Sequence, residues 1–340
     1  MTRQLGSTER FGVAVHGGTL ATAAAAARRA EERGFESVWT TEFYDRSATV
    51  SLAAMAAATS TITVGSGIAY AVGRSPLVLA IEARDLDELS GGRLVLGLGT
   101  GAKRMQQDWH GADGLSPAPR VEELVPLLRR IWAMDAAGVH HEGRFYRMAL
   151  QPTADVTPRA PIPVYLAGFN ARMVQAAGAV ADGLVGHPIF TPRYVREVVR
   201  PALDAGGARA GRVGTVPIAG YVICSVADDP ARARRDAAAQ IAFYTVVRTY
   251  APLVELEGFA AEVAAVREAW KRRDAQGMIA AVSPEMVARM AVAGTPEEAR
   301  EQIARFAGLY DRLLCYVPSY GLTPGEITER IDAVIDTFGE

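Results

Sequence analysis

The stretch Ser90-Gly91-Gly92-Arg93-Leu94-Val95-Leu96-Gly97-Leu98-Gly99-Thr100-Gly101 decides the predicted fold. Its apolar run, residues 94–98, is typical of a strand buried on both faces of a parallel sheet. Before the run, Gly91-Gly92 ends a helix that begins near Pro76, where proline suits the first turn. The glycines around the end of the strand allow backbone to approach a ligand closely. This order is the repeating unit of an α/β barrel: a helix that ends at glycine, a buried strand and a glycine-rich loop.

Seven further segments read as strands that precede helices. The eight strands are expected at residues 11–15, 37–41, 62–69, 94–98, 164–167, 183–186, 217–226 and 312–317. Eight right-handed strand-then-helix units close most simply into one (β/α)8 barrel over residues 1–340. The alternative is an open doubly wound sheet with an appended helical domain. The barrel is preferred because no change in composition divides the chain.

The segments between these units also carry expectations. A helix is predicted over residues 122–134, and residues 136–161 are expected to be an irregular excursion. A helical insertion is expected at about residues 230–290, between strands seven and eight. Thr19, Asp229, Thr295 and Thr323 are candidate helix N-caps, because short polar side chains satisfy the free amides of a first turn.

The balance of charge excludes some partners. The chain has 340 residues, 36 of them Lys or Arg and 38 Asp or Glu, for a net charge of −2. A nucleic-acid or anionic-membrane surface needs a clustered basic excess, so neither partner is expected. Cys224 and Cys315 match no metal spacing and read as buried thiols in a reducing compartment. Residues 1–10 lack a signal-peptide core and no run reaches transmembrane length, which predicts a cytoplasmic protein.

Three side chains at strand ends are candidates for chemistry or ligand contact. Glu42 follows strand two, and a partly buried carboxylate with a raised pKa suits acid–base work. Its alternative role is to cap the next loop. His187 follows strand six and is a candidate proton carrier, although a lone histidine is often a satisfied structural residue. His16, after strand one, is a weaker candidate of the same kind.

Other motifs are ambiguous or favour a structural role. His110, His140 and His141 are expected to be solvated in loops, and no carboxylate spacing predicts a metal site. Residues 97–101 read Gly-x-Gly-x-Gly rather than Gly-x-Gly-x-x-Gly, so a dinucleotide fingerprint is not expected. Glycines inside strand three, residues 65–67, indicate a bulge or a close ligand approach. The aromatic residues Phe243, Tyr244, Tyr250, Phe259 and Tyr320 are either core or the wall of a substrate pocket.

Four blocks in order resemble the bacterial-luciferase-like superfamily. They are residues 34–42, 74–99, 161–183 and 293–298, and within the superfamily the chain is most similar to oxidoreductases that use the deazaflavin coenzyme F420. The resemblance implies a (β/α)8 barrel, a homodimer and a cofactor in the barrel mouth. It departs from many relatives in one respect, because Glu42 is followed by Phe43 where they carry histidine.

The resemblance also implies positions for the cofactor. Gly67-Ile68 matches a non-prolyl cis peptide that forms a bulge behind the deazaflavin ring. Residues 168–171 match a phosphate-binding turn at a helix N-terminus, where free N–H groups favour an anion. The full set of expected cofactor-binding residues is His16, Ser66, Gly67, Ile68, Thr100, Gly101, Lys103, Ala167, Gly168, Phe169, Asn170, Ala171 and Gly186.

Three functional hypotheses follow. The first is hydride transfer between C5 of coenzyme F420 and a small organic substrate, with Glu42 or His187 placed for proton transfer. The second replaces the cofactor with reduced FMN and oxygen, giving a two-component monooxygenase of the same fold. The third is a barrel without catalytic activity that binds a flavin-like ligand or serves as a partner subunit.

Overall fold

The computed structural model describes residues 10–154 and 160–340, which fall into two compact units. Unit 1 contains the described residues up to Trp39, then Gly186–Arg200 and Ile218–Glu340. Unit 2 contains the described residues of Thr40–Val185 together with Pro201–Pro217. Each unit therefore combines segments that are distant in the sequence.

Unit 1 is built on parallel strands. They are β1 (Arg10–Ala14), β2 (Ser37–Thr40, whose last residue belongs to unit 2), β10 (Ile218–Val226), β11 (Ala291–Gly294) and β12 (Arg312–Tyr316), in the order β11-β10-β12-β1-β2. In the register of β1 and β12, Gly12 lies opposite Leu314, and on the other side of β1 the same residue lies opposite Ser37. All nine residues of β10 are buried, as expected for a strand covered on both faces.

The helices of unit 1 follow its strands along the chain, and side chains cap the N-termini of several of them. They are α1 (Leu20–Glu32), α7 (Pro192–Tyr194), η1 (Val195–Val199), α9 (Pro230–Thr245), η2 (Arg248–Tyr250), α10 (Ala251–Glu257), α11 (Ala260–Lys271), α12 (Ala275–Ala280), α13 (Pro284–Met290), α14 (Pro296–Ile303), η3 (Ala304–Phe306) and α15 (Pro324–Phe338). Thr19, Thr295 and Thr323 each form a capping box with the residue three positions later. Asp229 caps α9 by accepting from the Ala231 amide.

Unit 2 has a second parallel set of strands. They are β3 (Thr63–Ser66), β4 (Ala69–Tyr70), β5 (Leu94–Gly99), β8 (Val164–Ala167) and β9 (Gly183–Gly186), in the order β3-β5-β8-β9, with β4 also pairing with β5. The last residue of β9, Gly186, belongs to unit 1. The helices are α2 (Ala48–Ala58), α3 (Pro76–Ser90), α4 (Lys103–His110), α5 (Pro117–Trp132), α6 (Ala171–Val180) and α8 (Arg200–Arg209).

The predicted helix over residues 122–134 begins earlier than expected. Helix α5 starts at Pro117, which leaves Pro126 inside the helix, on its exposed side. Helix α4 was not predicted, because its sequence, Lys103–His110, buries a single residue, Gln106. A helix with so narrow a buried face has no apolar stripe in its sequence to mark it.

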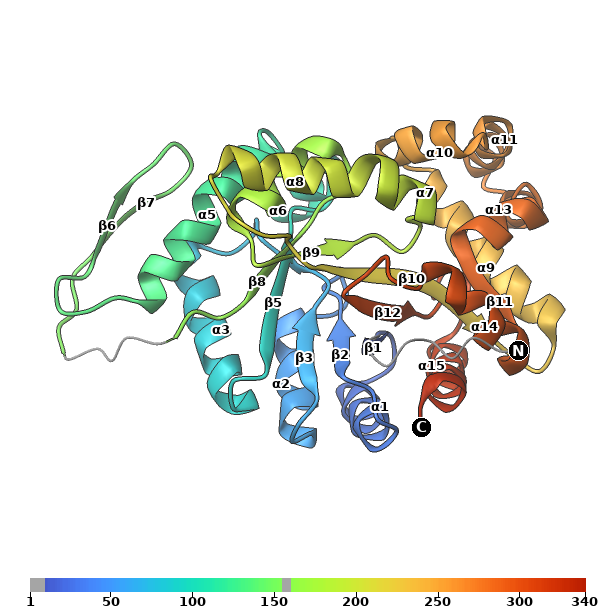
Figure 1. Cartoon of the computed structure of the whole chain (residues 1–340), viewed down its shortest axis with the longest axis horizontal. Helices are drawn as coiled ribbons and strands as arrows, with labels where there is room; N and C mark the ends of the chain where they lie inside the picture. The colour runs from blue at the N-terminus through green and yellow to red at the C-terminus, as the bar shows by residue number, and fades with distance from the viewer. Residues whose placement is uncertain (1–9, 155–159) are drawn as a thin grey trace. The chain divides into compact units, whose positions relative to one another are not determined.

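The expected irregular excursion at 136–161 is wrong for its first half. Strands β6 (Val139–Glu142) and β7 (Arg147–Leu150) form an antiparallel hairpin beside α5 (Figure 1). The Glu123 carboxylate on α5 accepts from the amide of Tyr146 at 2.9 Å and contacts His141 Nε2 at 3.0 Å. A tertiary contact therefore holds the hairpin. Residues 155–159 of the excursion lie outside the described residues.

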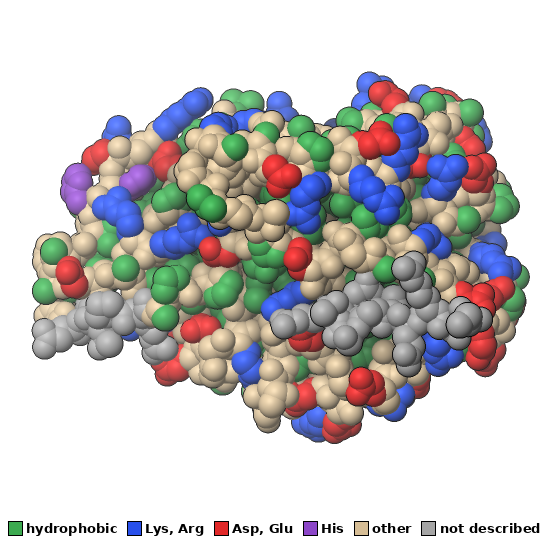
Figure 2. Space-filling model, viewed as in Figure 1, with side chains coloured by type: hydrophobic (Ala, Val, Ile, Leu, Met, Phe, Trp, Pro, Cys, Tyr) green, Lys and Arg blue, Asp and Glu red, His purple; other side chains and the backbone are tan. Residues whose placement is uncertain are grey.

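The segment that follows β10 also departs from expectation. Residues 230–290 are helical, as predicted, but they lead into the unexpected strand β11, which pairs with the last residues of β10. Charged side chains of both signs are interspersed on the face drawn in Figure 2. Among the described residues, no helix combines the length and apolar character needed to span a bilayer.

Candidate active site

A kink between β3 and β4 occupies the position that the glycine-rich break predicted. The Gly67–Ile68 peptide bond is cis, which confirms the bulge expected there. The amide of Gly67 donates to the Thr40 carbonyl at 2.7 Å, and the Ile68 carbonyl accepts from the Glu42 amide at 2.8 Å. The last residue of β2 and the loop after it therefore bond to both sides of the bulge.

Strand β5 is hydrogen-bonded to the residue that precedes the same bulge. Ser66 Oγ donates to the Gly97 carbonyl at 2.8 Å and accepts from the Gly97 amide at 2.9 Å. A Cβ atom at Gly97 would overlap the Ser66 carbonyl oxygen, and one at Gly99 would lie 3.0 Å from the Ile68 side chain and 3.3 Å from Ala167. The glycines of the opening stretch are thus required for close packing, and Ile68, Gly99 and Ala167 lie together.

Glu42 is buried beside this bulge, but its environment is the opposite of the expected one. Its carboxylate accepts from the Tyr70 amide at 2.8 Å and from two nitrogens of Arg74 at 2.8 and 2.5 Å. Arg74 also contacts Glu82 at 2.9 Å. Burial acts to raise the pKa of Glu42, but the bonds from Arg74 and Tyr70 outweigh it and lower the pKa.

The expected raised pKa of Glu42 is therefore wrong, since an ionised carboxylate held by a guanidinium keeps its charge at neutral pH. The sequence contained the partner, Arg74, in one of the family-like blocks. Spacing alone did not indicate that the two residues meet. The geometry fits a residue that braces the loop against β4.

The predicted phosphate-binding turn connects β8 to α6. A Cβ atom at Gly168 would lie 2.9 Å from the Val174 amide, so this glycine lets the strand end pack on the first turn of the helix. Asn170 is the N-cap residue, but its side chain makes no capping hydrogen bond. The first amides of a helix have no partner within the helix, which leaves this N-terminus suited to an anion.

Thr100, Gly101 and Lys103 lie between β5 and α4. Thr100 is buried and its hydroxyl contacts the Gly101 carbonyl at 3.3 Å, while Gly101 and Lys103 are exposed. Gly101 has a φ of 68°, and a Cβ atom there would lie 2.9 Å from the Tyr70 ring. This loop is therefore joined to β4, the strand that follows the bulge.

Two of the histidines expected to be solvated are instead packed. The His110 ring lies 4.6 Å from the Tyr70 ring, and His141 contacts Glu123. His140 is exposed, as expected. Histidine type and loop position could not distinguish these cases, because each packed ring depends on a residue distant in sequence.

Sequence reasoning missed an exposed aromatic cluster in unit 2. Phe43, Tyr44 and Trp109 are 37%, 76% and 43% exposed, and their ring centroids lie 4.6–5.9 Å apart. Consecutive aromatic residues directly after Glu42 were the available signal. The cluster joins the loop after β2 to α4.

His187 lies in unit 1, directly after β9, against aromatic rings. Its centroid is 4.7 Å from Tyr244 and 4.5 Å from Tyr250. The Ile189 amide donates to His187 Nδ1 at 3.4 Å, so the neutral ring carries its proton on Nε2. Burial lowers the pKa of His187 to about 3. A Cβ atom at the preceding Gly186 would lie 3.2 Å from Phe190.

His16 joins the same aromatic region from the end of β1. Its ring stacks on Tyr316 at 4.8 Å, and Tyr316 lies 5.6 Å from Tyr221. Both ring nitrogens of His16 are buried, and the ring interacts with the Val317 backbone. Burial lowers the pKa of His16 to about 4, and the Val317 backbone opposes this effect. The hydroxyl of Tyr316 is hydrogen-bonded to Tyr244 and Ser319.

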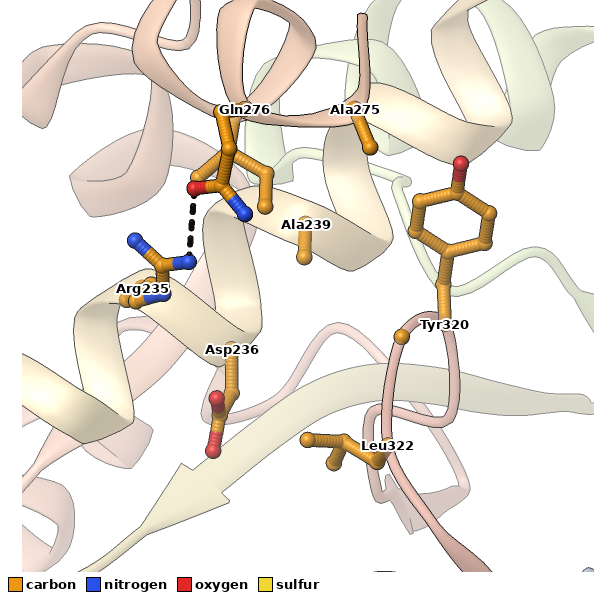
Figure 3. Close-up of a pocket in the computed structure, with 9 residues that line it drawn as sticks. Arg235, Asp236, Ala239, Ala275, Gln276, Tyr320 and Leu322 are labelled. Carbon is orange, nitrogen blue, oxygen red and sulfur yellow. Dashed lines mark hydrogen bonds between the residues drawn. The ribbon is translucent and has the colours of Figure 1, made fainter. Parts of the chain in front are cut away.

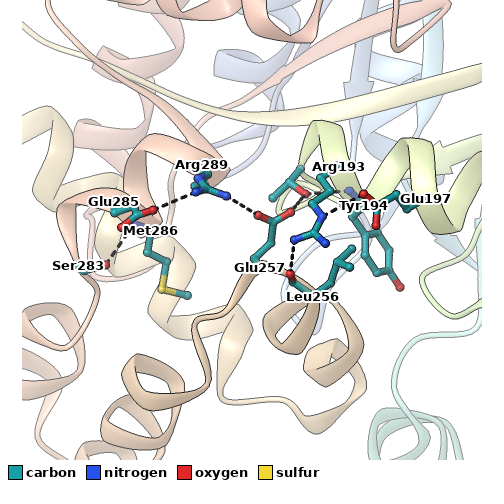
Figure 4. Close-up of polar contacts among 10 residues, drawn as sticks. Arg193, Tyr194, Glu197, Leu256, Glu257, Ser283, Glu285, Met286 and Arg289 are labelled. Carbon is teal, nitrogen blue, oxygen red and sulfur yellow. Dashed lines mark hydrogen bonds and ion pairs between the residues drawn. The ribbon is translucent and has the colours of Figure 1, made fainter.

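A buried polar network holds the segment after His187 in place (Figure 4). Glu257 accepts from Thr191 at 2.5 Å and from Arg289 at 3.0 Å, while Arg193 donates to the Leu256 carbonyl at 2.7 Å. These bonds tie α7 to α10 and α13. The helical insertion therefore anchors the chain beside His187.

Tyr320, which follows β12, lines a pocket of about 320 Å³ with Ala239, Ile279 and Leu322 (Figure 3). Its ring stacks on Phe243 at 4.9 Å. The charged side chains of this pocket are already bonded, since Arg235 donates to Gln276 at 2.7 Å and Asp236 accepts from Arg330 at 3.0 Å. The pocket is a weaker candidate than the cluster around His16.

Comparison with known proteins defines the class. The coenzyme F420-dependent tetrahydromethanopterin reductase from Methanopyrus kandleri matches with a TM-score of 0.81 and 25% identity, covering 98% of this chain and 100% of that one. Together with the parallel strands and the helices between them, this match confirms the predicted (β/α)8 barrel fold.

The family model described as luciferase-like monooxygenase matches residues 4–312, so the chain belongs to this family. An uncharacterized protein of Mycobacterium tuberculosis is 34% identical over 87% of this chain and 89% of its own length. The 5,10-methylenetetrahydromethanopterin reductase of Archaeoglobus fulgidus is 29% identical over 81% of this chain and 82% of its own length.

Proposed function

We propose that the chain is a coenzyme F420-dependent oxidoreductase that moves a hydride between the deazaflavin C5 and a small organic substrate. The observation that carries this proposal is the uncapped N-terminus of α6 in the same unit as the closely packed Ile68, Gly99 and Ala167. A helix start suits a phosphate. The similarity to reductases, one of them named as F420-dependent, supports the same choice.

The residues present fit such a cofactor. Ile68 is partly accessible and is flanked by the small residues Gly99 and Ala167. In this proposal Ile68 supports the ring, residues 168–171 bind the phosphate, and Thr100, Gly101 and Lys103 hold the ring or the tail. When bound, a deazaflavin supplies a carbon that gives or accepts a hydride.

Proton transfer is assigned to His187 rather than to Glu42. The neutral His187 ring offers the Nε2 proton as a hydrogen-bond donor at physiological pH, because burial keeps its pKa near 3. Glu42 is a positioning residue in this proposal, because Arg74 and Tyr70 occupy its carboxylate. The absence of histidine after Glu42 is consistent with a proton carrier at a different strand end.

Binding of purified full-length protein to coenzyme F420, followed by quenching of the cofactor's fluorescence, tests the assignment. We expect saturable quenching, weakened at least tenfold by Gly168→Ala, because the added methyl group disturbs the first turn of α6. Gly325→Ala is the matched control, since a Cβ atom there meets no described atom within 4 Å. Absence of quenching by the unmodified chain would refute the proposal.

A measurement of oxygen uptake distinguishes the proposed F420-dependent activity from an activity that uses reduced FMN. The same phosphate site serves both cofactors, and the second hypothesis requires oxygen consumption that depends on reduced FMN. Binding of either cofactor without turnover of any substrate would favour the third hypothesis, a barrel without catalytic activity.

We also propose that the protein is a cytoplasmic homodimer. Helix α2 carries no charged residue, and Val50 on α2 with Val78 and Ile81 on α3 are 51%, 41% and 48% exposed. A helix that is apolar on all sides requires a further partner. Light scattering coupled to size exclusion should show a dimer that Ile81→Asp converts to a monomer; a monomeric unmodified protein would contradict the proposal.

A further inference from the structure

The pocket of about 320 Å³ shown in Figure 3 lies between two helices and a loop of unit 1. Helix α9 contributes Arg235 and Ala239, helix α12 contributes Gln276 and Ile279, and the loop after β12 contributes Tyr320. This volume is at the lower end of the range for sites that bind small organic molecules. None of the residues proposed above to bind the cofactor is among the described residues that line it, so the pocket is a separate site.

The loop that forms one wall of the pocket is fixed on helix α9. Gln240 Oε1 accepts from the amides of Ser319 at 2.8 Å and of Tyr320 at 3.1 Å. The Tyr320 ring also stacks on Phe243, with 4.9 Å between the ring centroids. Because these contacts already hold the wall in place, a ligand binds here without having to order the loop.

The two charged side chains that line the pocket differ in their partners. Asp236 is buried in an ion pair with Arg330, whose Nε lies 3.0 Å from the Asp236 carboxylate. Arg235 instead donates to the neutral Gln276 amide oxygen at 2.7 Å, and no described Asp or Glu forms an ion pair with it. A guanidinium keeps its charge at physiological pH. The pocket therefore carries one positive charge that no carboxylate balances.

Much of the remaining lining is apolar. Ala239, Ile279 and Leu322 contribute alkyl groups, and Tyr320 presents its ring on the side of the pocket opposite Arg235 (Figure 3). Apolar surface that leaves water for such a lining gains free energy in proportion to its area. A ligand that matches the whole pocket therefore combines an apolar body with one negative charge at the end that lies beside Arg235.

We propose that this pocket binds a small organic monoanion with a flat apolar body, and that the ligand's carboxylate pairs with Arg235. The inference does not depend on the proposed function and adds a second ligand site to the protein. A guanidinium and a carboxylate form two parallel hydrogen bonds, which a neutral amide such as Gln276 does not match in strength. A dianion fits less well, because Arg235 is the one unbalanced cation among the described residues that line the pocket.

A matched pair of probes tests the charge preference. Naphthalene-2-carboxylate and naphthalene-2-carboxamide share the flat ring system and differ in charge. Their binding to the full-length protein without cofactor is measured by saturation-transfer NMR titration. We expect the carboxylate to bind about tenfold more tightly, because hydrogen bonds to a charged group are stronger than those to a neutral one. Absence of carboxylate binding, or equal binding of the amide, would overturn the inference.

A variant at Arg235 tests the residue assigned to the anion. Arg235→Gln removes the charge and should weaken carboxylate binding about tenfold while leaving amide binding unchanged. Arg234→Gln is the matched control, because Arg234 lies on the same helix, donates to Glu298 at 2.7 Å and does not line the pocket. Full carboxylate affinity in Arg235→Gln would contradict the role of Arg235.

A second variant tests where the probes bind. Ala275 is the exposed first residue of α12 and lines the pocket, so Ala275→Leu should fill part of its volume and weaken the binding of both probes. Ala280→Leu, at an exposed position of the same helix that does not line the pocket, is the control. Unchanged binding in Ala275→Leu would place the probes elsewhere and refute the inference, and this answer does not require Arg235→Gln to fold.

Discussion

Ionisable side chains differ in charge between the bulge region of unit 2 and the aromatic rings around His16 and His187 in unit 1. Glu42 is buried and stays ionised, because Arg74 and the Tyr70 amide bond to its carboxylate. His16 and His187 lie against aromatic rings, and burial lowers their pKa values to about 4 and 3. Burial alone therefore does not determine charge; the partner that the fold supplies decides it.

The largest expected effect comes from removing one partner of the charged region. Arg74→Met leaves the Glu42 carboxylate buried without its cation and should lower the free energy of unfolding by about 3–5 kcal/mol. Urea denaturation at pH 7 measures the change.

The double variant Glu42→Gln, Arg74→Met is the control for this experiment. It removes both charges and should recover part of the loss, since a neutral pair leaves no isolated ion. A single variant as stable as the unmodified protein would show that the ion pair does not hold the loop.

Disturbing the packing of β5 against the bulge should lower the free energy of unfolding by a somewhat smaller amount. Gly97→Ala places a methyl group against the Ser66 carbonyl oxygen, and we expect a loss of about 3 kcal/mol as β3 and β5 shift apart. Gly91→Ala is the comparison, with a φ of 67° but no described atom near its Cβ, so only backbone strain of about 1 kcal/mol is expected. Similar losses in the two variants would remove the argument for close packing at Gly97.

The two regions should also respond to pH in different windows. Because the folded pKa values of His16 and His187 lie below the ordinary 6.5, the unfolded chain binds more protons as pH falls below 6.5, and stability declines toward pH 4 and 3. At pH 5 each histidine should account for about 2 kcal/mol of this loss. Glu42, with a lowered pKa, contributes stability that declines only below about its ordinary 4.5.

Denaturant titrations of His16→Phe and His187→Phe at pH 7 and pH 5 check the difference. Each variant should lose less stability between the two pH values than the unmodified protein. His140→Phe should keep the full dependence. If each histidine variant loses as much stability between pH 7 and pH 5 as the unmodified protein, His16 and His187 do not cause the pH dependence.

The smallest expected effect on stability comes from removing one hydroxyl group among the aromatic rings beside His16. Tyr316→Phe removes the hydroxyl that links Tyr244 to Ser319 but keeps the ring stacked on His16. We expect a loss of about 1 kcal/mol in thermal or urea unfolding, with no change in the pH response of the histidines. A loss as large as that of Arg74→Met would show that the hydroxyl chain, rather than ring packing, holds the cluster.

Much of the fold was predictable because its signals are local. The buried run at residues 94–98, the capping threonines and the glycine break before Ile68 each act through neighbours within a few residues. The hairpin at β6 and β7 was not predictable, because Glu123 from a preceding helix holds it. The candidate site divides in the same way: the bulge was found, whereas the pairing of Glu42 with Arg74 was not.

The sequence by itself determined the order of strands and helices, the caps that begin the helices and the place of the kink, because hydrophobic period, turn residues and glycine act over short distances. Only the tertiary structure decided which buried groups are charged. A carboxylate meets its guanidinium, and a histidine meets aromatic rings, through contacts between residues that lie tens to hundreds of positions apart in the chain.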